Sequence, residues 1–303
     1  MKYRIEKDSL GDVRVPEKAL WGAQTQRALD NFTISGIKFV FPFGRSFIEA
    51  LGMIKFSAAA ANNKLKLLPA NKAAAIKLAS KDVLNGLHDD SFPLDVFQTG
   101  SGTSTNMNAN EVIANIASKK SKLKINANDD VNMSQSSNDV IPTAICVSAL
   151  IDMNRLLLPN LDELINSIDL KMKQVKGNVK TGRTHLMDAM PIDFSQELSG
   201  WKAQLEANKK TITQATNRMN ELPQGGTAIG TGINAHKDFS KNFCSELNKL
   251  SKFNTKPAKN FYQGLSSVDN AVELSSALKN LSVILMKISN DLRWMNSGPL
   301  TGL

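Results

Sequence analysis

Four polar segments of this sequence combine the residue types that bind anions or transfer protons. They are residues 98–108 (QTGSGTSTNMN), 128–139 (NDDVNMSQSSND), 182–189 (GRTHLMDA) and 224–234 (QGGTAIGTGIN). Glycine lets backbone N–H groups approach a ligand closely, and Ser, Thr and Asn side chains add neutral hydrogen-bond donors. Segments of this composition suit a carboxylate or a phosphate.

The first two segments also have plainer interpretations. Residues 98–108 could form an ordinary turn that caps a helix starting near Asn106, and they do not match the GxxxxGK[ST] pattern of a nucleotide P-loop. Residues 128–139 lead into a helix behind Pro142, which Ser137, Asn138 or Asp139 could cap. The unpaired N–H groups and the dipole at such a helix N-terminus equally favour a bound anion. Composition alone leaves both interpretations open.

The third and fourth segments differ in chemistry. Residues 182–189 contain His185, one of three histidines, and an imidazole titrates near neutral pH, as proton transfer requires. A lone histidine is more often a structural hydrogen-bonding residue. Residues 224–234 hold four glycines after Pro223 and cannot form a regular helix, so we interpret most of them as a tight loop between two bundle helices.

Long periodic segments must position these polar segments. Apolar residues recur at three- and four-residue steps through residues 268–296, which predicts a bundle helix. Two more long helices are predicted over residues 142–172, kinked or divided near Pro159, and 194–222. Each has one apolar stripe that needs a packing partner, so the sequence predicts a mainly α-helical, elongated and oligomeric bundle. Shorter helices alternate with polar loops before residue 132, where we place a domain boundary.

Composition and charge narrow the function classes. The net charge is +9, but the lysines are dispersed and not interleaved with aromatic residues, which disfavours nucleic-acid binding. A basic surface could instead attract small dicarboxylates. Cys146 and Cys244 lie far apart and indicate neither a disulfide framework nor a zinc site. The charged start lacks the apolar run of a signal peptide or membrane span, so we expect a cytoplasmic protein without membrane contact.

Taken together, the motifs resemble the fumarase/aspartase superfamily. The strings LWGAQTQRALDNF (residues 20–32) and HDDSFPLDVFQTGSGTSTNMNANE (88–111) resemble family signatures, and the four polar segments follow in the family's order. His185 stands where aspartases typically have Gln, and SSN (136–138) stands where they tend to have Ser-Thr-Asn. The chain is therefore most similar to class II fumarases. An enzyme resembling aspartate ammonia-lyase and a non-catalytic helical scaffold are the alternatives.

This resemblance implies an all-α fold with a long-helix central bundle (residues 132–303) and a smaller mixed N-terminal domain (1–131). It implies reversible hydration of fumarate to L-malate without a metal or organic cofactor, in a homotetramer whose active sites gather residues from three subunits. His185 would be the catalytic proton donor and acceptor. The two substrate carboxylates would be held by Ser101, Gly102, Thr103, Ser136, Ser137, Asn138 and Thr184.

The chain departs from the family pattern in two places. Fumarases usually have His at the position of Asn126, in a second, non-catalytic dicarboxylate site formed here by Asn126, Ala127, Asn128 and Asp129. Asn cannot supply the titratable charge, so we expect that site to be weakened or absent. The family also continues past SGPLTGL into a GSSxMPxKxNP loop that bears the C3 base, and then into a C-terminal domain. We therefore expect negligible activity from these 303 residues alone.

Overall fold

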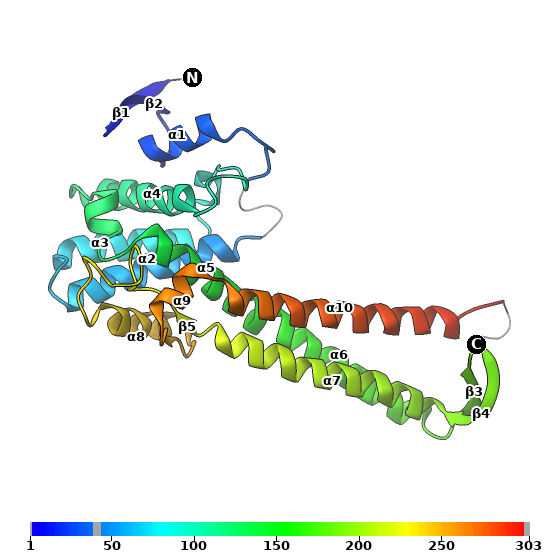
Figure 1. The fold of residues 1–303 in the computed structure, drawn as a ribbon. Helices are drawn as coiled ribbons and strands as arrows, with labels where there is room; N and C mark the ends of the chain where they lie inside the picture. Colours follow the sequence, from blue (N-terminus) through cyan, green and yellow to red (C-terminus); the bar gives the residue numbers. More distant parts are fainter. Residues whose placement is uncertain (1, 39–43, 300–303) are drawn as a thin grey trace. The chain divides into compact units, whose positions relative to one another are not determined.

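The computed structural model describes residues 2–38 and 44–299, and the chain divides into two compact units. Unit 1 contains Met1–Ile151 and Met219–Val268, and unit 2 contains Asp152–Arg218 and Asp269–Leu303. Helices dominate both units, which confirms the predicted fold class (Figure 1). Grouping by contact does not test the domain boundary predicted between residues 131 and 132, which stays a prediction. The chain end, residues 300–303, lies outside the described residues.

Unit 1 is a packed set of helices with one β-hairpin. Helix α2 packs against α3, α4 and α8, and most of its residues are buried, as expected for a helix rich in Ala that is apolar on several faces. The elements of unit 1 are β1 (Tyr3–Asp8), β2 (Gly11–Pro16), α1 (Ala23–Asn31), α2 (Ser46–Lys64), α3 (Ala70–Leu84), η1 (Asp89–Ser91), α4 (Thr103–Ser121), η2 (Ala127–Val131), α5 (Ser137–Asp152), β5 (Glu221–Leu222), α8 (Phe239–Ser251), β6 (Lys256–Pro257) and α9 (Phe261–Ser266).

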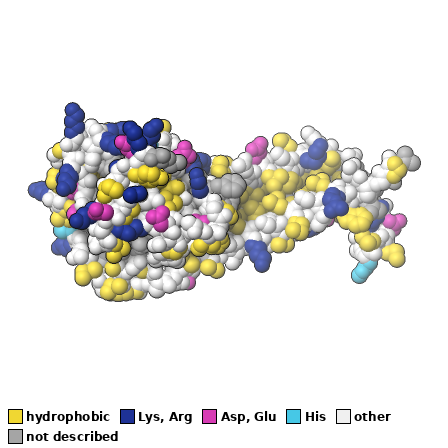
Figure 2. Space-filling model, turned by 90° about the horizontal axis from the view of Figure 1, so that it is seen from above, with side chains coloured by type: hydrophobic (Ala, Val, Ile, Leu, Met, Phe, Trp, Pro, Cys, Tyr) yellow, Lys and Arg dark blue, Asp and Glu magenta, His cyan; other side chains and the backbone are white. Residues whose placement is uncertain are grey.

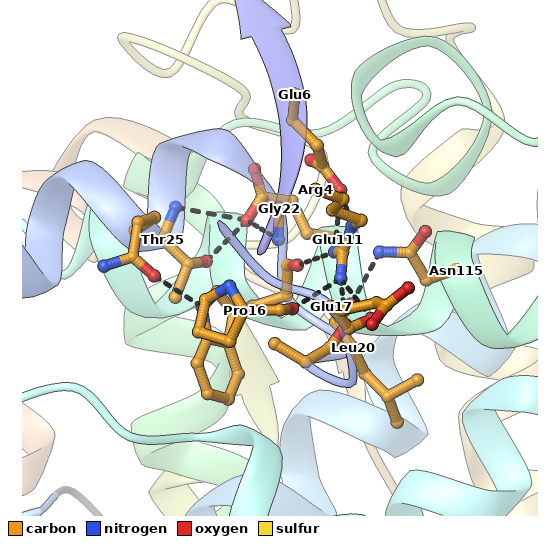
Figure 3. Close-up of polar contacts among 12 residues, drawn as sticks. Arg4, Glu6, Pro16, Glu17, Leu20, Gly22, Thr25, Glu111 and Asn115 are labelled. Carbon is orange, nitrogen blue, oxygen red and sulfur yellow. Dashed lines mark hydrogen bonds and ion pairs between the residues drawn. The ribbon is translucent and has the colours of Figure 1, made fainter. Parts of the chain in front are cut away.

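Two charged side chains, one on the antiparallel hairpin β1–β2 and one on α4, bind the segment that follows the hairpin (Figure 3). The guanidinium of Arg4 donates hydrogen bonds to backbone carbonyls of four residues between Pro16 and Trp21, at 2.7–3.1 Å. The buried carboxylate of Glu111 accepts hydrogen bonds from three backbone amides between Gly22 and Thr25. Arg4 thus satisfies carbonyls of the connection between β2 and α1, and Glu111 satisfies unpaired amides at the start of α1.

Unit 2 is built from three long helices and a second hairpin. Its elements are η3 (Met153–Leu157), α6 (Leu158–Val175), β3 (Val179–Thr184), β4 (Met187–Asp193), α7 (Phe194–Arg218) and α10 (Asp269–Met295). Helix α7 packs against both α6 and α10. The predicted stripe is buried at Trp201, Leu205 and Ile212 of α7, and Leu274, Leu281 and Ile288 are buried on α10. The two predicted long helices are therefore confirmed, each within a few residues of its expected ends.

The helical run before Pro159 is broken as predicted. One turn of π-helix, η3, separates α5 from α6 immediately before this proline. A proline has no amide hydrogen and its ring crowds the carbonyl four residues earlier, so the regular hydrogen-bond ladder cannot continue there. The start of the run differs from the prediction, because α5 begins at Ser137 and contains Pro142.

By length and composition alone, the segment Ser137–Val175 could cross a membrane, since its most apolar window has a mean hydropathy of 1.5. However, 44% of that window is buried inside the protein. Val140, Val147 and Leu150 of α5 lie in the core of unit 1, with at most 1% of each side chain exposed. This burial favours a core helix over a membrane span.

Several large apolar side chains of unit 2 remain exposed. Figure 2 shows hydrophobic side chains gathered along its long helices. On α10 the exposed set comprises Val272, Val283, Leu285, Met286, Leu292 and Trp294. So many exposed large apolar side chains on one helix exceed the scattered apolar exposure of an ordinary surface and favour contact with another protein surface.

Candidate functional site

A cavity of about 360 Å³ in unit 1 brings several of the predicted site residues together. Ser101 reaches it from the first polar segment, and Ser137 and Asn138 reach it from the second. The complete lining is Gly100, Ser101, Ser137, Asn138, Ile141, Pro142, Ile145, Ala228, Leu265, Ser266, Ser267 and Val268. The lining is therefore uncharged and combines hydroxyl and amide groups with apolar side chains.

The first wall of the cavity is the turn that precedes α4. Its geometry depends on Gly102, which has a φ of +68° and whose hydrogen faces Ile141 of α5 so closely that a Cβ atom would lie 2.9 Å from that side chain. Only glycine meets both conditions without strain. The Gln98 side chain then accepts hydrogen bonds from the amide and hydroxyl of Thr105. Ser101 therefore lies in a turn that is fixed by the Gln98–Thr105 hydrogen bonds and by the contact of Gly102 with Ile141.

The second wall is the N-terminus of α5. The Ser136 hydroxyl oxygen accepts the amide hydrogen of Asn138 at 3.3 Å, and the Asp139 carboxylate accepts that of Ser136 at 2.9 Å. This reciprocal arrangement is a capping box, which starts the helix before Pro142. It leaves Ser137 and Asn138 in the first turn, where the helix dipole favours negative charge.

The glycine-rich segment is bound to this same helix start. The second oxygen of Asp139 accepts hydrogen bonds from the amides of Gly225 and Thr227, at 3.0 and 2.9 Å. The side-chain amide of Asn138 donates to the backbone carbonyl of Ala228 at 2.6 Å. The segment is a loop of turns, as expected, and it connects α7 and β5 to α8. Its first four residues, 224–227, are buried, and Asp139 binds two of them to the core of unit 1.

A buried lysine lies behind the second wall. Lys55 of α2 is fully buried, and its ammonium donates to the side-chain oxygens of Asn106, Asn132 and Gln135 at 2.8–3.0 Å. Burial lowers the pKa of Lys55 to about 7, although the Asp139 carboxylate opposes that shift. Burial likewise raises the pKa of Asp139 to about 6, against its three backbone hydrogen bonds and the charge of Lys55.

The remaining predicted site residues do not line this cavity. Thr103 begins α4 two residues after the lining residue Ser101, and Ser136 caps α5 immediately before the lining residue Ser137. Thr184 and His185 belong to unit 2, where His185 forms the two-residue turn between β3 and β4 with Leu186. Both turn residues have positive φ, 54° and 59°, and are exposed. A primed turn of this kind matches the strand twist but usually contains Gly or Asn.

The residues predicted to form a second site lie beside a different cavity of unit 1, of about 400 Å³. Asn126, Ala127 and Asn128 line it, together with three carboxylates, Glu6, Asp8 and Glu111. The Asn126 side-chain oxygen accepts the amide hydrogens of Asn128 and Asp129 at 2.8 and 3.0 Å. These two amides begin η2 and are thus already satisfied within the chain.

Sequence reasoning missed three parts of this arrangement. Lys55 sits in an otherwise apolar stretch (LGMIKFSAAAA), which was a usable signal. Asp139 stands three residues after Ser136, the spacing of a capping box, and this was a second signal. The segment 265–268 carries no motif, and only tertiary packing places it at the cavity. Within the described residues, no group of three or more His, Cys, Asp or Glu side chains is arranged to hold a metal ion.

The arrangement in unit 1 can bind an anion. Its polar wall offers hydroxyls, a side-chain amide and the first turn of a 16-residue helix, all of which donate hydrogen bonds or favour negative charge. No acidic side chain lines this cavity.

Comparison with known proteins identifies close relatives. A family model described as Lyase matches residues 11–303. The class II fumarate hydratase of Xylella fastidiosa is 52% identical over 302 residues, covering 100% of this chain and 63% of that protein. A class II fumarate hydratase of Pseudomonas aeruginosa is 49% identical over 300 residues, covering 99% of this chain and 65% of that protein.

The structural comparison agrees with these matches. The crystal structure of a class II fumarase from Schistosoma mansoni has a TM-score of 0.94 to this chain at 37% identity, covering 99% of this chain and 67% of that one. The chain therefore spans less than two thirds of the length of the two curated relatives, 63% and 65%, and about two thirds of the solved structure.

Proposed function

This chain belongs to the lyase family whose members include class II fumarate hydratases, and on that premise we propose that it is part of an enzyme that reversibly hydrates fumarate to L-malate. The observation that carries the proposal is the cavity at the start of α5. There Ser101, Ser137 and Asn138 converge from segments 36 or more residues apart on an uncharged, hydrogen-bonding wall.

The chemistry of hydration explains why such a wall is needed. Loss of the C3 proton from malate places a second negative charge on the neighbouring carboxylate, and fixed donors must stabilise it in the transition state. Neutral hydroxyls and amides at a helix N-terminus supply this stabilisation without binding the ground-state dianion too tightly. In this proposal Ser101, Ser137 and Asn138 hold one carboxylate, with Gly102 shaping the turn, and Thr103 and Ser136 adjoin them.

Thr184 and His185 enter the proposal through oligomer formation. His185 would donate and accept the proton of the added water, and Thr184 would bind substrate beside it. Both lie in an exposed hairpin of unit 2, and α10 of the same unit carries exposed apolar side chains. We infer a homotetramer in which this hairpin completes a cavity of another copy of the chain. The similarity to bacterial class II fumarate hydratases supports the predicted cytoplasmic location.

The second dicarboxylate site is proposed to be weak or absent. Asn126 itself occupies the two amides that would otherwise receive a carboxylate. The adjoining cavity is also lined by three acidic residues, Glu6, Asp8 and Glu111, against one basic residue, Lys7, and this excess of negative charge disfavours a dianion.

Calorimetric titration of fumarate into the chain tests the proposed binding wall. We expect saturable binding that weakens about tenfold or more in Ser137→Ala and Asn138→Ala, since each change removes a donor to a charged ligand, worth roughly 1.5–3 kcal/mol. Asn280→Ala on the exposed face of α10 is the matched control and should bind as the wild type does. Equal affinity in all four proteins would contradict the proposed site.

A further inference from the structure

The buried Lys55 fixes the orientation of three side-chain amides. An ammonium group donates hydrogen bonds and accepts none, so each amide that it contacts must present its oxygen. Lys55 Nζ lies 2.8 Å from Asn106 Oδ1, and Asn132 and Gln135 offer the other two oxygens. The NH₂ group of Asn106 must therefore point away from Lys55.

The NH₂ group of Asn106 donates toward the cavity wall. Its Nδ2 atom donates to Ser137 Oγ at 2.9 Å and, more weakly, to Asn132 Oδ1 at 3.3 Å, and Asn106 is itself completely buried. The Ser137 hydroxyl oxygen thus accepts a hydrogen bond from Asn106. Among the described residues none accepts the Ser137 hydroxyl proton, and Ser137 lines the cavity.

We propose that Lys55 is a positioning residue which, through Asn106, turns the Ser137 hydroxyl into a hydrogen-bond donor toward a carboxylate in the cavity. The chain of contacts runs from Lys55 Nζ to Asn106 Oδ1, and from Asn106 Nδ2 to Ser137 Oγ. The proposal rests on the proposed function, because a dicarboxylate is the ligand that requires a donor there. Cooperative polarisation along such a chain strengthens the final hydrogen bond.

The charge balance around Lys55 supports a role of this kind. Asp139 is the charged group that acts on it electrostatically, yet the two side chains make no ion pair, because the Asp139 oxygens are used by the amides of Ser136, Gly225 and Thr227. A buried ammonium held only by neutral amides is costly, and an apolar side chain would fill the same space more cheaply. The ammonium orients those three side-chain amides, which an apolar side chain could not do.

The test reverses the direction of the hydrogen bond between residue 106 and Ser137. Asn106→Asp keeps the shape and the acceptor for Lys55 but replaces the NH₂ donor with a second oxygen, to which Ser137 must now donate. We expect fumarate affinity, measured by calorimetry, to fall at least tenfold in Asn106→Asp. In a Ser137→Ala background the same change should cost nothing further. Lys55→Met should show the same dependence on Ser137, with a smaller loss.

This double-mutant cycle separates positioning from the other effects of the substitutions. Repulsion between the new carboxylate and fumarate, or a general loss of structure, would weaken binding equally in both backgrounds and would overturn the proposal. Wild-type affinity in Asn106→Asp would overturn it as well. Melting temperatures measured on all variants identify any that fail to fold.

A measurement without ligand keeps the two proposals distinguishable. In nitrogen-edited NMR spectra, the Asn106 side-chain amide protons should shift in Ser137→Ala and in Lys55→Met, because each change removes a contact of that amide. Unchanged signals would overturn the proposed contact chain even if fumarate binds. Shifted signals in a chain that binds no fumarate would support the contact chain and refute the proposed function.

Discussion

Asn126 shows how one side chain can occupy the backbone N–H groups that a ligand would otherwise bind. Its side-chain oxygen caps the two backbone amides at the start of η2, and its backbone N–H donates to the Asp130 carboxylate at 2.8 Å. Asn126→Ala should lower the free energy of unfolding by about 1 kcal/mol, as loss of a helix N-cap does. Chemical denaturation measures this change. Asn128→Ala, an exposed amide on the same element, should have little effect, and equal destabilisation by both would contradict the capping role.

Lys55 gives a pH dependence whose sign follows from its depressed pKa. The folded-state pKa of about 7 lies below the ordinary value of 10.5, so the unfolded chain binds more protons between these limits. The contribution of Lys55 to the free energy of unfolding therefore increases as pH rises from about 7 toward 10.5, by roughly 1 kcal/mol per pH unit. Denaturation at pH 7.5, 8.5 and 9.5 should show a rise that Lys55→Met lacks. An identical pH slope in both proteins would rule out a depressed Lys55 pKa.

Asp139 acts in the opposite direction and at lower pH. Its folded-state pKa of about 6 lies above the ordinary value of 3.8, so the folded chain binds more protons between these limits. Its contribution to stability therefore falls as pH rises from about 3.8 to 6. The Asp139→Asn variant should lose this fall in denaturation measurements. The two groups together place a stability minimum between about pH 6 and 7.

At the scale of elements, the contact between the start of α4 and α5 depends on one glycine. Gly102→Ala should cost about 1–2 kcal/mol for the left-handed backbone alone, and more because its Cβ would meet Ile141 at 2.9 Å. Gly100→Ala is the matched control, since nothing lies within 4 Å of a Cβ there. Thermal denaturation compares the two variants. A Gly102→Ala protein as stable as Gly100→Ala would show that this contact is not tight.

The helices were predictable from the sequence because their own residues encode them. The leucine and isoleucine spacing of residues 268–296 specifies α10, and Pro159 specifies the break at η3. The hairpin β3–β4 was missed because its turn is His185-Leu186, without the Gly or Asn that usually marks such a turn. The glycine-rich segment was predicted as a loop, but its position was not, because Asp139 sets it through a contact 86 residues away in sequence from Gly225.

The candidate site was predictable only where residue type and chemistry coincide. Ser101, Ser137 and Asn138 stood out as donors in polar segments, and they do meet at one cavity. Lys55 did not stand out, because a single lysine in a helix usually extends to solvent and only the three facing amides reveal its burial. His185 belongs to the other unit, and its joining these residues in an oligomer remains part of the proposal.

At the scale of the whole molecule, a site shared between copies of the chain can be tested by mixing. In chains extended with the part of the Xylella fastidiosa relative that this chain does not cover, Ser137→Ala and His185→Asn should each abolish most fumarate hydration. Oligomers assembled from both variants together should recover part of it, because some sites then receive both intact residues. Recovery is measured as fumarate consumption after co-expression. A mixture no more active than either variant would contradict a shared site.

The most direct measurement is the substrate preference of that extended chain without further substitutions. Fumarate hydration is followed by the loss of ultraviolet absorbance, and ammonia release from L-aspartate is followed in parallel. The proposed function predicts consumption of fumarate and no release of ammonia, since His185 stands where aspartases typically have Gln. Release of ammonia from aspartate without hydration of fumarate would contradict it.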